Sequence, residues 1–294
     1  MKECYWSKLL LFGEYSMIFD GSAMVIPLKR FSARWIMSQG MKDEFLCFSS
    51  RELSCFCRFL AEDETLAALI DTSALNSDLT NGWALASNVP LGYGLGSSGT
   101  VVAAVYDRYA NEKTSDAMVL KKLFARMESF FHGSSSGIDP LQCYLGRPFR
   151  ISSSEIQTLP EAFPKEDIHI CLIDTKTKSN TKPLVESFRK QRDNPEFLYA
   201  FEQEYLPCVR NCMDALIQGN SGRFFSALQQ LSASQLRFFR AMIPDSVLSL
   251  FESSFGFSFG IKILGSGGGG YMLGFTDAPE KVSNALDGKD LLWV

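Results

Sequence analysis

Residues Pro90-Leu-Gly-Tyr-Gly-Leu-Gly-Ser-Ser-Gly-Thr100 join a glycine-rich loop directly to the small, apolar residues 101–106. Glycines allow a tight turn and a close approach of the backbone to a ligand. The helix predicted behind the loop begins with unpartnered N–H groups and a partial positive charge, which favour a phosphate. The stretch therefore predicts a phosphate-binding loop. It is not a Walker A loop, because Gly-x-x-x-x-Gly-Lys-Ser/Thr is absent.

Two other polar segments extend this prediction. Phe131-His-Gly-Ser-Ser-Ser-Gly-Ile-Asp-Pro140 ends in one carboxylate, and Leu264-Gly-Ser-Gly-Gly-Gly-Gly270 lies near the C-terminus. Phosphoryl transfer needs positioned phosphates and a group that accepts the proton of the attacking hydroxyl. A nucleotide cradle, an acidic residue and a second glycine loop together predict phosphoryl transfer to a small molecule.

Bulk properties exclude several classes of function. With 294 residues, the chain is long enough for one or two domains. Hydrophobic residues make up 46% of it and charged residues 21%, proportions that are typical of globular proteins. A net charge of −4 argues against a nucleic-acid partner. No apolar run approaches the roughly 20 residues of a membrane span. Glu3 and Lys8 interrupt the N-terminal apolar residues, so we expect no signal peptide and no membrane partner.

The cysteines and histidines limit the chemistry further. The eight cysteines are scattered without a Cys-x-x-Cys pair, so we predict reduced thiols in a cytoplasmic protein rather than zinc ligands or disulfides. The sequence contains two histidines, His132 and His169, and so small a number argues against a Ser-His-Asp triad and against a metal site built from histidines. We interpret both histidines, and Cys143, as packing residues.

The pattern of apolar residues predicts an α+β fold. We predict strands at 9–12, 23–26, 83–86, 168–173, 260–264 and 271–275, β-rich sequence at 31–48 with a turn at Gln39-Gly40, and a strand or hairpin at 141–151. We predict helices at 52–61, 63–70, 98–110, 115–129, 183–192, 196–218, 221–239 and 244–253. The proline-containing segment 159–166 predicts a domain boundary, with domains at 1–160 and 161–294.

Five motifs in this order resemble those of the GHMP small-molecule kinases, and within them the mevalonate kinases. Lys8-Leu-Leu-Leu-Phe-Gly-Glu-Tyr15, residues 90–100 and residues 265–271 resemble the first, second and third family motifs. His132-Gly-Ser-Ser-Ser-Gly-Ile-Asp139 is similar to His-Gly-Asn-Pro-Ser-Gly-x-Asp, and Asp174-Thr-Lys-Thr-Lys-Ser-Asn-Thr181 to Asn-Thr-Lys-x-x-x-Asn-Thr. The resemblance implies a two-lobed GHMP kinase fold, with a ribosomal protein S5 domain 2-like, ATP-binding N-terminal lobe and a ferredoxin-like C-terminal lobe.

The resemblance also implies an activity. It is the ATP- and Mg²⁺-dependent phosphorylation of a small alcohol, with mevalonate converted to 5-phosphomevalonate as the best candidate. Phosphomevalonate or a sugar as the acceptor, and a catalytically inactive nucleotide-binding regulator, stay open as alternatives. The expected partner is the alcohol substrate, and the expected assembly is a monomer or a homodimer.

The resemblance assigns roles at the nucleotide. The residues expected around the triphosphate of ATP are Gly92, Gly94, Leu95, Gly96, Ser97, Ser98 and Gly99. Ser98 and Glu128 are expected to bind Mg²⁺, which prefers hard oxygen ligands. Two plainer interpretations remain: Ser98 is a helix N-cap, and Glu128 is a solvated helix residue.

It also assigns the reacting groups. Asp139 is expected to accept the hydroxyl proton with Lys8 beside it; the alternatives are a turn residue before Pro140 and a surface lysine. The residues expected near the acceptor are Glu14, Tyr15, Thr181, Gly267 and Gly268. Thr181 would otherwise cap a helix, and the glycines would otherwise form a plain hairpin turn.

The chain departs from the family pattern at four places. The departures are Trp6-Ser7 for Pro-Gly, Tyr15 for His, Gly99-Thr100 for Ala-Ala, and Ser134-Ser135 for Asn-Pro. We predict that Tyr15 and the Ser134-Ser135 pair lie nearer the acceptor than ATP, and therefore bear on the choice of acceptor.

Overall fold

The computed structural model describes residues 2–38, 50–161, 163–164, 167–177, 181–252, 258–286 and 288–294. These separate into two compact units, the first comprising Met1–Leu9, Ile26–Leu91 and Leu95–Pro148, and the second Leu10–Val25, Gly92–Gly94 and Phe149–Val294. Strands β1 (Tyr5–Phe12) and β2 (Ala23–Met37) run from one unit into the other. The division into domains 1–160 and 161–294 remains a prediction, and the expected turn at Gln39-Gly40 lies outside the described residues.

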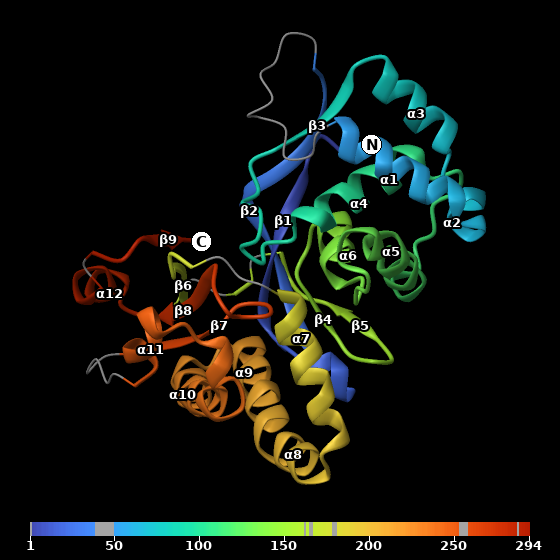
Figure 1. Ribbon diagram of the computed structural model, residues 1–294. Helices are drawn as coiled ribbons and strands as arrows, with labels where there is room; N and C mark the ends of the chain where they lie inside the picture. The colour runs from blue at the N-terminus through green and yellow to red at the C-terminus, as the bar shows by residue number, and fades with distance from the viewer. Residues whose placement is uncertain are drawn as a thin grey trace. The chain divides into compact units, whose positions relative to one another are not determined.

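The first unit combines strands of a five-stranded sheet, in which β2 pairs with both β1 and β3, with a group of helices (Figure 1). The later part of β2 pairs antiparallel with β3 (Trp83–Ser87), from Ala33 opposite Ser87 to Met37 opposite Trp83. The helices are α1 (Ser50–Glu62), α2 (Glu64–Leu69), α3 (Thr72–Thr80), α4 (Ser97–Tyr109), α5 (Ala117–His132) and α6 (Ile138–Leu145). The helices predicted at 52–61, 63–70, 98–110 and 115–129 and the strand at 83–86 are confirmed, whereas α3 was not predicted.

Helix α4 forms the centre of the first unit because it is apolar on every side. Residues 100–106 are each at most 1% exposed, and α3, α5 and α6 pack against the helix. The indole Nε1 of Trp35 on β2 donates to the carbonyl of Ala104 at 3.2 Å. A helix that is buried all round has few ways to shift, so it holds the glycine-rich loop at its N-terminus in place.

Helix α6 corrects one prediction. The strand or hairpin expected at 141–151 is wrong over its first part, since α6 continues to Leu145 and only Phe149–Ile151 form strand β4. Gly137 precedes the helix with a φ of 73°, and Gly146 follows it with a φ of 67°, values that glycine adopts at little cost. A short apolar run such as 141–145 does not distinguish a buried helix from a strand, which explains the error.

The second unit contains a four-stranded antiparallel sheet in the order β7-β8-β6-β9. Its strands are β6 (His169–Asp174), β7 (Phe259–Ile263), β8 (Tyr271–Thr276) and β9 (Leu291–Trp293). In the same unit, the first residues of β2 pair with β4, and β4 pairs with β5 (Ile156–Thr158). The strands predicted at 168–173, 260–264 and 271–275 are confirmed, and β5 and β9 are additional.

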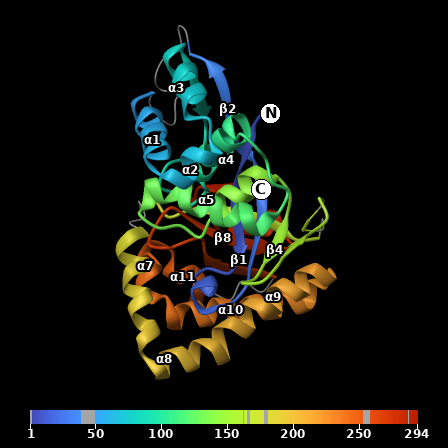
Figure 2. The same cartoon turned by 90° about the vertical axis from the view of Figure 1, so that its right-hand side faces the viewer.

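The second unit also contains a series of α-helices. They are α7 (Thr181–Lys190), α8 (Pro195–Ala200), α9 (Leu206–Gln218), α10 (Ser221–Phe238), α11 (Asp245–Glu252) and α12 (Pro279–Ala285). A π-helical segment, Phe201–Tyr205, joins α8 to α9, and Figure 2 shows the three as one long helical run. Helix α10 packs on β7 and α9, where the fully buried Phe224 meets Phe12 and Phe275. The helices predicted at 183–192, 196–218, 221–239 and 244–253 are confirmed, whereas α12 was not predicted.

None of the helices in the described part of the chain is long and apolar enough to cross a membrane.

Candidate functional site

The phosphate loop of the first unit leads into α4 through a glycine. Gly96 is the N-cap of α4, with a φ of 79° and no side chain to cap the helix. Leu95, 1% exposed, accepts a hydrogen bond at its carbonyl from the N–H of Lys8 at 3.2 Å. Ser98 therefore lies inside the first turn, and its interpretation as the N-cap is wrong. The N–H groups of this turn, which no side chain caps, are suited to an anion.

Lys8 and Asp139 form an ion pair beside this loop. The Nζ of Lys8 lies 3.0 Å from Oδ2 of Asp139, and the lysine side chain is 4% exposed while the aspartate side chain is 32% exposed. Lys8 is therefore not a surface lysine. Asp139 lies in the first turn of α6, and its partial exposure leaves the carboxylate accessible to a ligand.

Gly99 explains how the loop and Asp139 come so close. A Cβ atom at Gly99 would lie 2.9 Å from both the carbonyl carbon of Asp139 and the nitrogen of Pro140, which is closer than real Cβ contacts. The absence of a side chain thus lets the first turn of α4 lie directly on the backbone that carries Asp139. One of the departures from the family pattern, Gly99, is a feature of the packing between α4 and α6.

A third group of side chains surrounds Glu128 on α5. The hydroxyl of Ser98 donates to Oε1 of Glu128 at 2.8 Å, and the hydroxyl of Ser135 donates to Oε2. The Nε2 of His132 lies 3.0 Å from the Ser98 hydroxyl oxygen. Glu128 is 4% exposed, so its interpretation as a solvated helix residue is wrong. The sequence analysis interpreted His132 as a packing residue and predicted Ser135 nearer the acceptor than ATP, so it missed the contacts of both with this group.

The surroundings of Glu128 alter its acidity. Burial and the nearby charge of Asp139 raise the pKa of Glu128 to about 7, against the opposing effects of Ser135, Ser98 and Lys8. Burial also lowers the pKa of His132, which keeps that ring neutral at neutral pH. Burial disfavours the ionised form of such a carboxyl, and a nearby cation stabilises that form.

Ser98 and Glu128 offer the hard oxygen ligands that Mg²⁺ prefers, and their role as its ligands remains a prediction. Neighbouring ligands of an octahedral Mg²⁺ at 2.0–2.1 Å lie about 2.9 Å apart. The 2.8 Å between Ser98 Oγ and Glu128 Oε1 matches that spacing. Within the described residues, no group of three or more His, Cys, Asp or Glu side chains is arranged to hold a metal ion. The remaining ligands would be phosphate oxygens and waters, as is usual for Mg²⁺ at a nucleotide.

The second unit contains the other glycines of the predicted site. Gly92 and Gly94 have φ values of 78° and 73°, and the third glycine motif connects β7 to β8. In that motif the N–H of Gly268 donates to the carbonyl of Met242 at 2.6 Å, and a Cβ at Gly267 would lie 2.7 Å from the same oxygen. The connection is thus a turn packed against a neighbouring segment rather than a plain hairpin turn. The role of Gly267 and Gly268 near the acceptor remains a prediction.

Tyr15 is fixed in an unusual backbone conformation. Its φ is 62°, in the left-handed region, and its hydroxyl donates to the carbonyl of Ser266 at 2.8 Å. Its ring lies 4.4 Å from that of Phe188 and 5.2 Å from that of Phe239, and burial raises the pKa of the phenol. Strained residues held by their surroundings are frequent at ligand sites. Contact of Tyr15 with the acceptor remains a prediction.

Glu14 and Thr181 are the other two side chains expected near the acceptor. The carboxylate of Glu14 is fully buried and pairs with Lys262 at 2.5 Å. The structure gives Thr181 as the first residue of α7, and its side chain lies outside the described residues. The roles of both residues at the acceptor remain predictions.

The Glu14–Lys262 pair leads to a prediction about stability. Both side chains are 0% exposed, and Lys262 also donates to the carbonyl of Ile263. Lys262→Met leaves the carboxylate of Glu14 buried without its cation, so we expect the free energy of unfolding to fall by about 3–5 kcal/mol. Urea denaturation followed by circular dichroism measures the change.

The double variant Lys262→Met with Glu14→Leu is the matched control. It removes both charges, so much of the lost stability should return. A single variant as stable as the parent chain would contradict the stabilising role of this ion pair.

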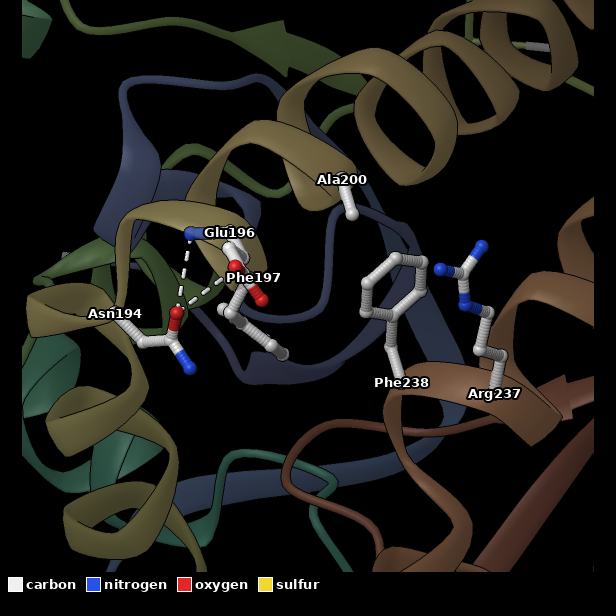
Figure 3. Close-up of a pocket in the computed structure, with 6 residues that line it drawn as sticks. All are labelled: Asn194, Glu196, Phe197, Ala200, Arg237 and Phe238. Carbon is white, nitrogen blue, oxygen red and sulfur yellow. Dashed lines mark hydrogen bonds between the residues drawn. The ribbon is translucent and has the colours of Figure 1, made fainter.

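A pocket of about 300 Å³ lies elsewhere in the second unit, between α8 and the end of α10 (Figure 3). Its lining residues are Asn194, Glu196, Phe197, Ala200, Arg237 and Phe238. The side-chain oxygen of Asn194 caps α8 by accepting from Glu196 and Phe197, and Arg237 pairs with Glu204. Its main polar groups already have protein partners, and none of the predicted site residues lines it.

Comparisons with known proteins agree with these features. The family model described as the GHMP kinases N terminal domain matches residues 64–147. The mevalonate kinase of Thermococcus gammatolerans is 25% identical over 304 residues, covering 94% of this chain and 89% of that protein. The resemblance to the GHMP kinases expected from the motifs is confirmed.

Solved structures agree in fold. The Streptococcus pneumoniae phosphomevalonate kinase in complex with phosphomevalonate and AMPPNP gives a TM-score of 0.71 at 18% identity, covering 99% of both chains. The L. major mevalonate kinase in complex with R-mevalonate gives 0.67 at 16% identity, covering 100% of this chain and 94% of that one. The expected mixed fold of helices and strands is therefore confirmed.

Proposed function

We propose that this chain, which resembles the GHMP kinases in sequence and fold, transfers the γ-phosphoryl group of ATP to the hydroxyl of a small alcohol. Mevalonate is the acceptor we favour, with 5-phosphomevalonate as the product. The similarity to a curated mevalonate kinase along 94% of the chain supports this choice. A cytoplasmic location is part of the proposal, supported by the fact that every cysteine among the described residues is free.

The Lys8–Asp139 pair beside the first turn of α4 carries the proposal. The carboxylate of Asp139 accepts the proton of the acceptor hydroxyl, and that oxygen forms a bond to the γ-phosphorus while the bond to the β-phosphate oxygen breaks. ADP leaves with that electron pair. The ammonium of Lys8, 3.0 Å from the carboxylate, balances the charge of Asp139 before the proton is transferred and helps to stabilise the negative charge of the transferred phosphoryl group.

The glycine-rich loop positions the nucleotide in this proposal. Backbone N–H groups at the start of α4 donate to the phosphate oxygens, and the helix dipole favours their charge. Ser98 and Glu128 would hold Mg²⁺, which neutralises phosphate charge when it is bound. Gly92, Gly94 and Leu95 complete the proposed nucleotide-binding segment.

A substrate screen tests the proposed function. The purified chain is incubated with ATP and Mg²⁺ and, in separate reactions, mevalonate, phosphomevalonate, homoserine and several sugars, and ADP release is measured. Release with mevalonate alone supports the proposal in full. ADP release with another alcohol supports the kinase activity but contradicts mevalonate as the acceptor. Nucleotide binding without release on any acceptor favours the inactive regulatory relative.

A further inference from the structure

Four side chains form a continuous line of hydrogen bonds in the first unit. His132 at the end of α5 contacts Ser98 at 3.0 Å, Ser98 donates to Glu128 at 2.8 Å, and Ser135 donates to the other oxygen of Glu128. Ser135 is itself fixed, because its hydroxyl oxygen accepts the N–H of Gly137 at 2.9 Å. The line therefore runs from the last turn of α5 through α4 to the loop before α6.

A count of protons gives each contact a direction. A serine hydroxyl has one proton and two lone pairs, and an ionised carboxylate has about four acceptor positions. Ser98 gives its proton to Glu128, so the Nε2 of His132 has to donate to the Ser98 oxygen. One lone pair of Ser98 remains, and two of the acceptor positions of Glu128 remain. Both oxygens are thus oriented by protein partners and still have capacity for a cation.

We propose that His132 and Ser135 are positioning residues that orient Ser98 and Glu128 as ligands of the nucleotide-bound divalent cation. This inference rests on the proposed function. Neither residue contacts the cation; His132 acts through Ser98, and Ser135 acts through Glu128. Partners of this kind fix the orientation of metal ligands, and their removal typically lowers metal affinity 10–100-fold.

A bulk-packing role predicts a different result. If His132 only filled space, a leucine of similar size would be better tolerated there than a polar glutamine. If it donates through Nε2, glutamine is the better replacement, because its amide nitrogen can take the place of Nε2. Ser135→Ala removes one oxygen from a half-buried loop residue, so its main effect should be on Glu128.

The test measures cation binding without turnover. Mn²⁺ affinity is determined by electron paramagnetic resonance with a non-hydrolysable ATP analogue bound, and analogue affinity is measured separately without metal. We expect His132→Leu and Ser135→Ala to weaken Mn²⁺ binding about tenfold or more, and His132→Gln to restore most of it. Glu128→Gln is the positive control. Ser129→Ala is the matched control, because Ser129 follows Glu128 on α5 and its hydroxyl donates only locally, to the carbonyl of Arg126.

The outcomes separate the two proposals. Mn²⁺ affinities of His132→Leu and Ser135→Ala that equal those of Ser129→Ala and the parent chain would overturn the inference. An affinity for His132→Gln as low as that for His132→Leu would also overturn the donor role of Nε2. If the parent chain phosphorylates an alcohol while both variants bind Mn²⁺ normally, the proposed kinase activity is supported and only the positioning role of His132 and Ser135 is contradicted. If the parent chain binds neither nucleotide nor Mn²⁺, both proposals fail.

Discussion

Asp139→Asn is expected to lower kcat for the favoured alcohol by about a thousandfold, within the range attributed to a general base. Asparagine has nearly the same shape but does not accept the hydroxyl proton at neutral pH. The Lys8 ammonium, 3.0 Å away, also loses its ion partner. The first turn of α4, the proposed phosphate site, keeps its contact with the backbone of residue 139, so nucleotide affinity should change little. Steady-state kinetics and a nucleotide titration measure the two quantities.

Asp116→Asn is the matched control for this variant. Asp116 caps α5 by accepting the N–H groups of Met118 and Val119, and asparagine caps helices as well as aspartate does. We expect its kcat and nucleotide affinity to equal those of the parent chain. A normal kcat in Asp139→Asn would show that Asp139 is not the base. A loss of nucleotide binding in parallel with kcat would place Asp139 at the phosphates instead.

Lys8→Met should lower kcat by about a hundredfold, the scale of removing one preorganised charge-stabilising group. The lysine stem packs against Gly96, where an added Cβ would lie 2.8 Å from Cγ of Lys8, and methionine fills most of the same volume. The carboxylate of Asp139 would face the reacting phosphate without a compensating charge, and repulsion would raise the barrier. The effect is measured as kcat at saturating ATP and alcohol, with circular dichroism to confirm folding.

Lys113→Met tests whether the effect belongs to this ion pair or to any lysine–aspartate pair. Lys113 pairs with Asp107 at 2.7 Å in the same unit and is 40% exposed. We expect it to keep its kcat within about twofold, because Asp107 lies near the C-terminal end of α4, at the opposite end of the helix from the glycine-rich loop. Equal losses of kcat in the two lysine variants would assign the effect to general destabilisation rather than to the reacting groups.

The sequence predicted the elements that depend on local pattern. Residues 101–106 are apolar on all sides, so a buried helix after a glycine-rich loop followed from composition alone, and α4 confirms it. The alternating and continuous apolar runs at 168–173 and 271–275 likewise marked β6 and β8. These features are set by neighbouring residues and therefore need no knowledge of the tertiary structure.

Features set by distant residues were harder to predict. Lys8 and Asp139 lie far apart in the sequence, and only the motif resemblance, not their spacing, brought them together before the structure did. The resemblance gave no role to His132, which we interpreted as a packing residue, because its contact with Ser98 depends on how α5 packs against α4. Ser135 was predicted nearer the acceptor than ATP, which stays a prediction, and its hydrogen bond to Glu128 is a contact that the sequence did not indicate.

Gly99 shows the same limit. The sequence presents it as a departure from a family pattern in a loop that is already rich in glycine. Only the packing of α4 on α6 shows why a side chain is excluded, since a Cβ would meet the backbone of Asp139 and Pro140 at 2.9 Å. Such close contacts between segments follow from tertiary packing and leave no local signal.

Phosphorus NMR of the purified chain with ATP, Mg²⁺ and mevalonate follows phosphoryl transfer to this alcohol as it occurs. The proposal predicts that the γ-phosphate signal of ATP declines while ADP and one new phosphomonoester signal grow in equal amounts, and that Asp139→Asn abolishes this change on the same time scale. An unchanged ATP spectrum, or the growth of inorganic phosphate alone, would contradict phosphoryl transfer to this alcohol.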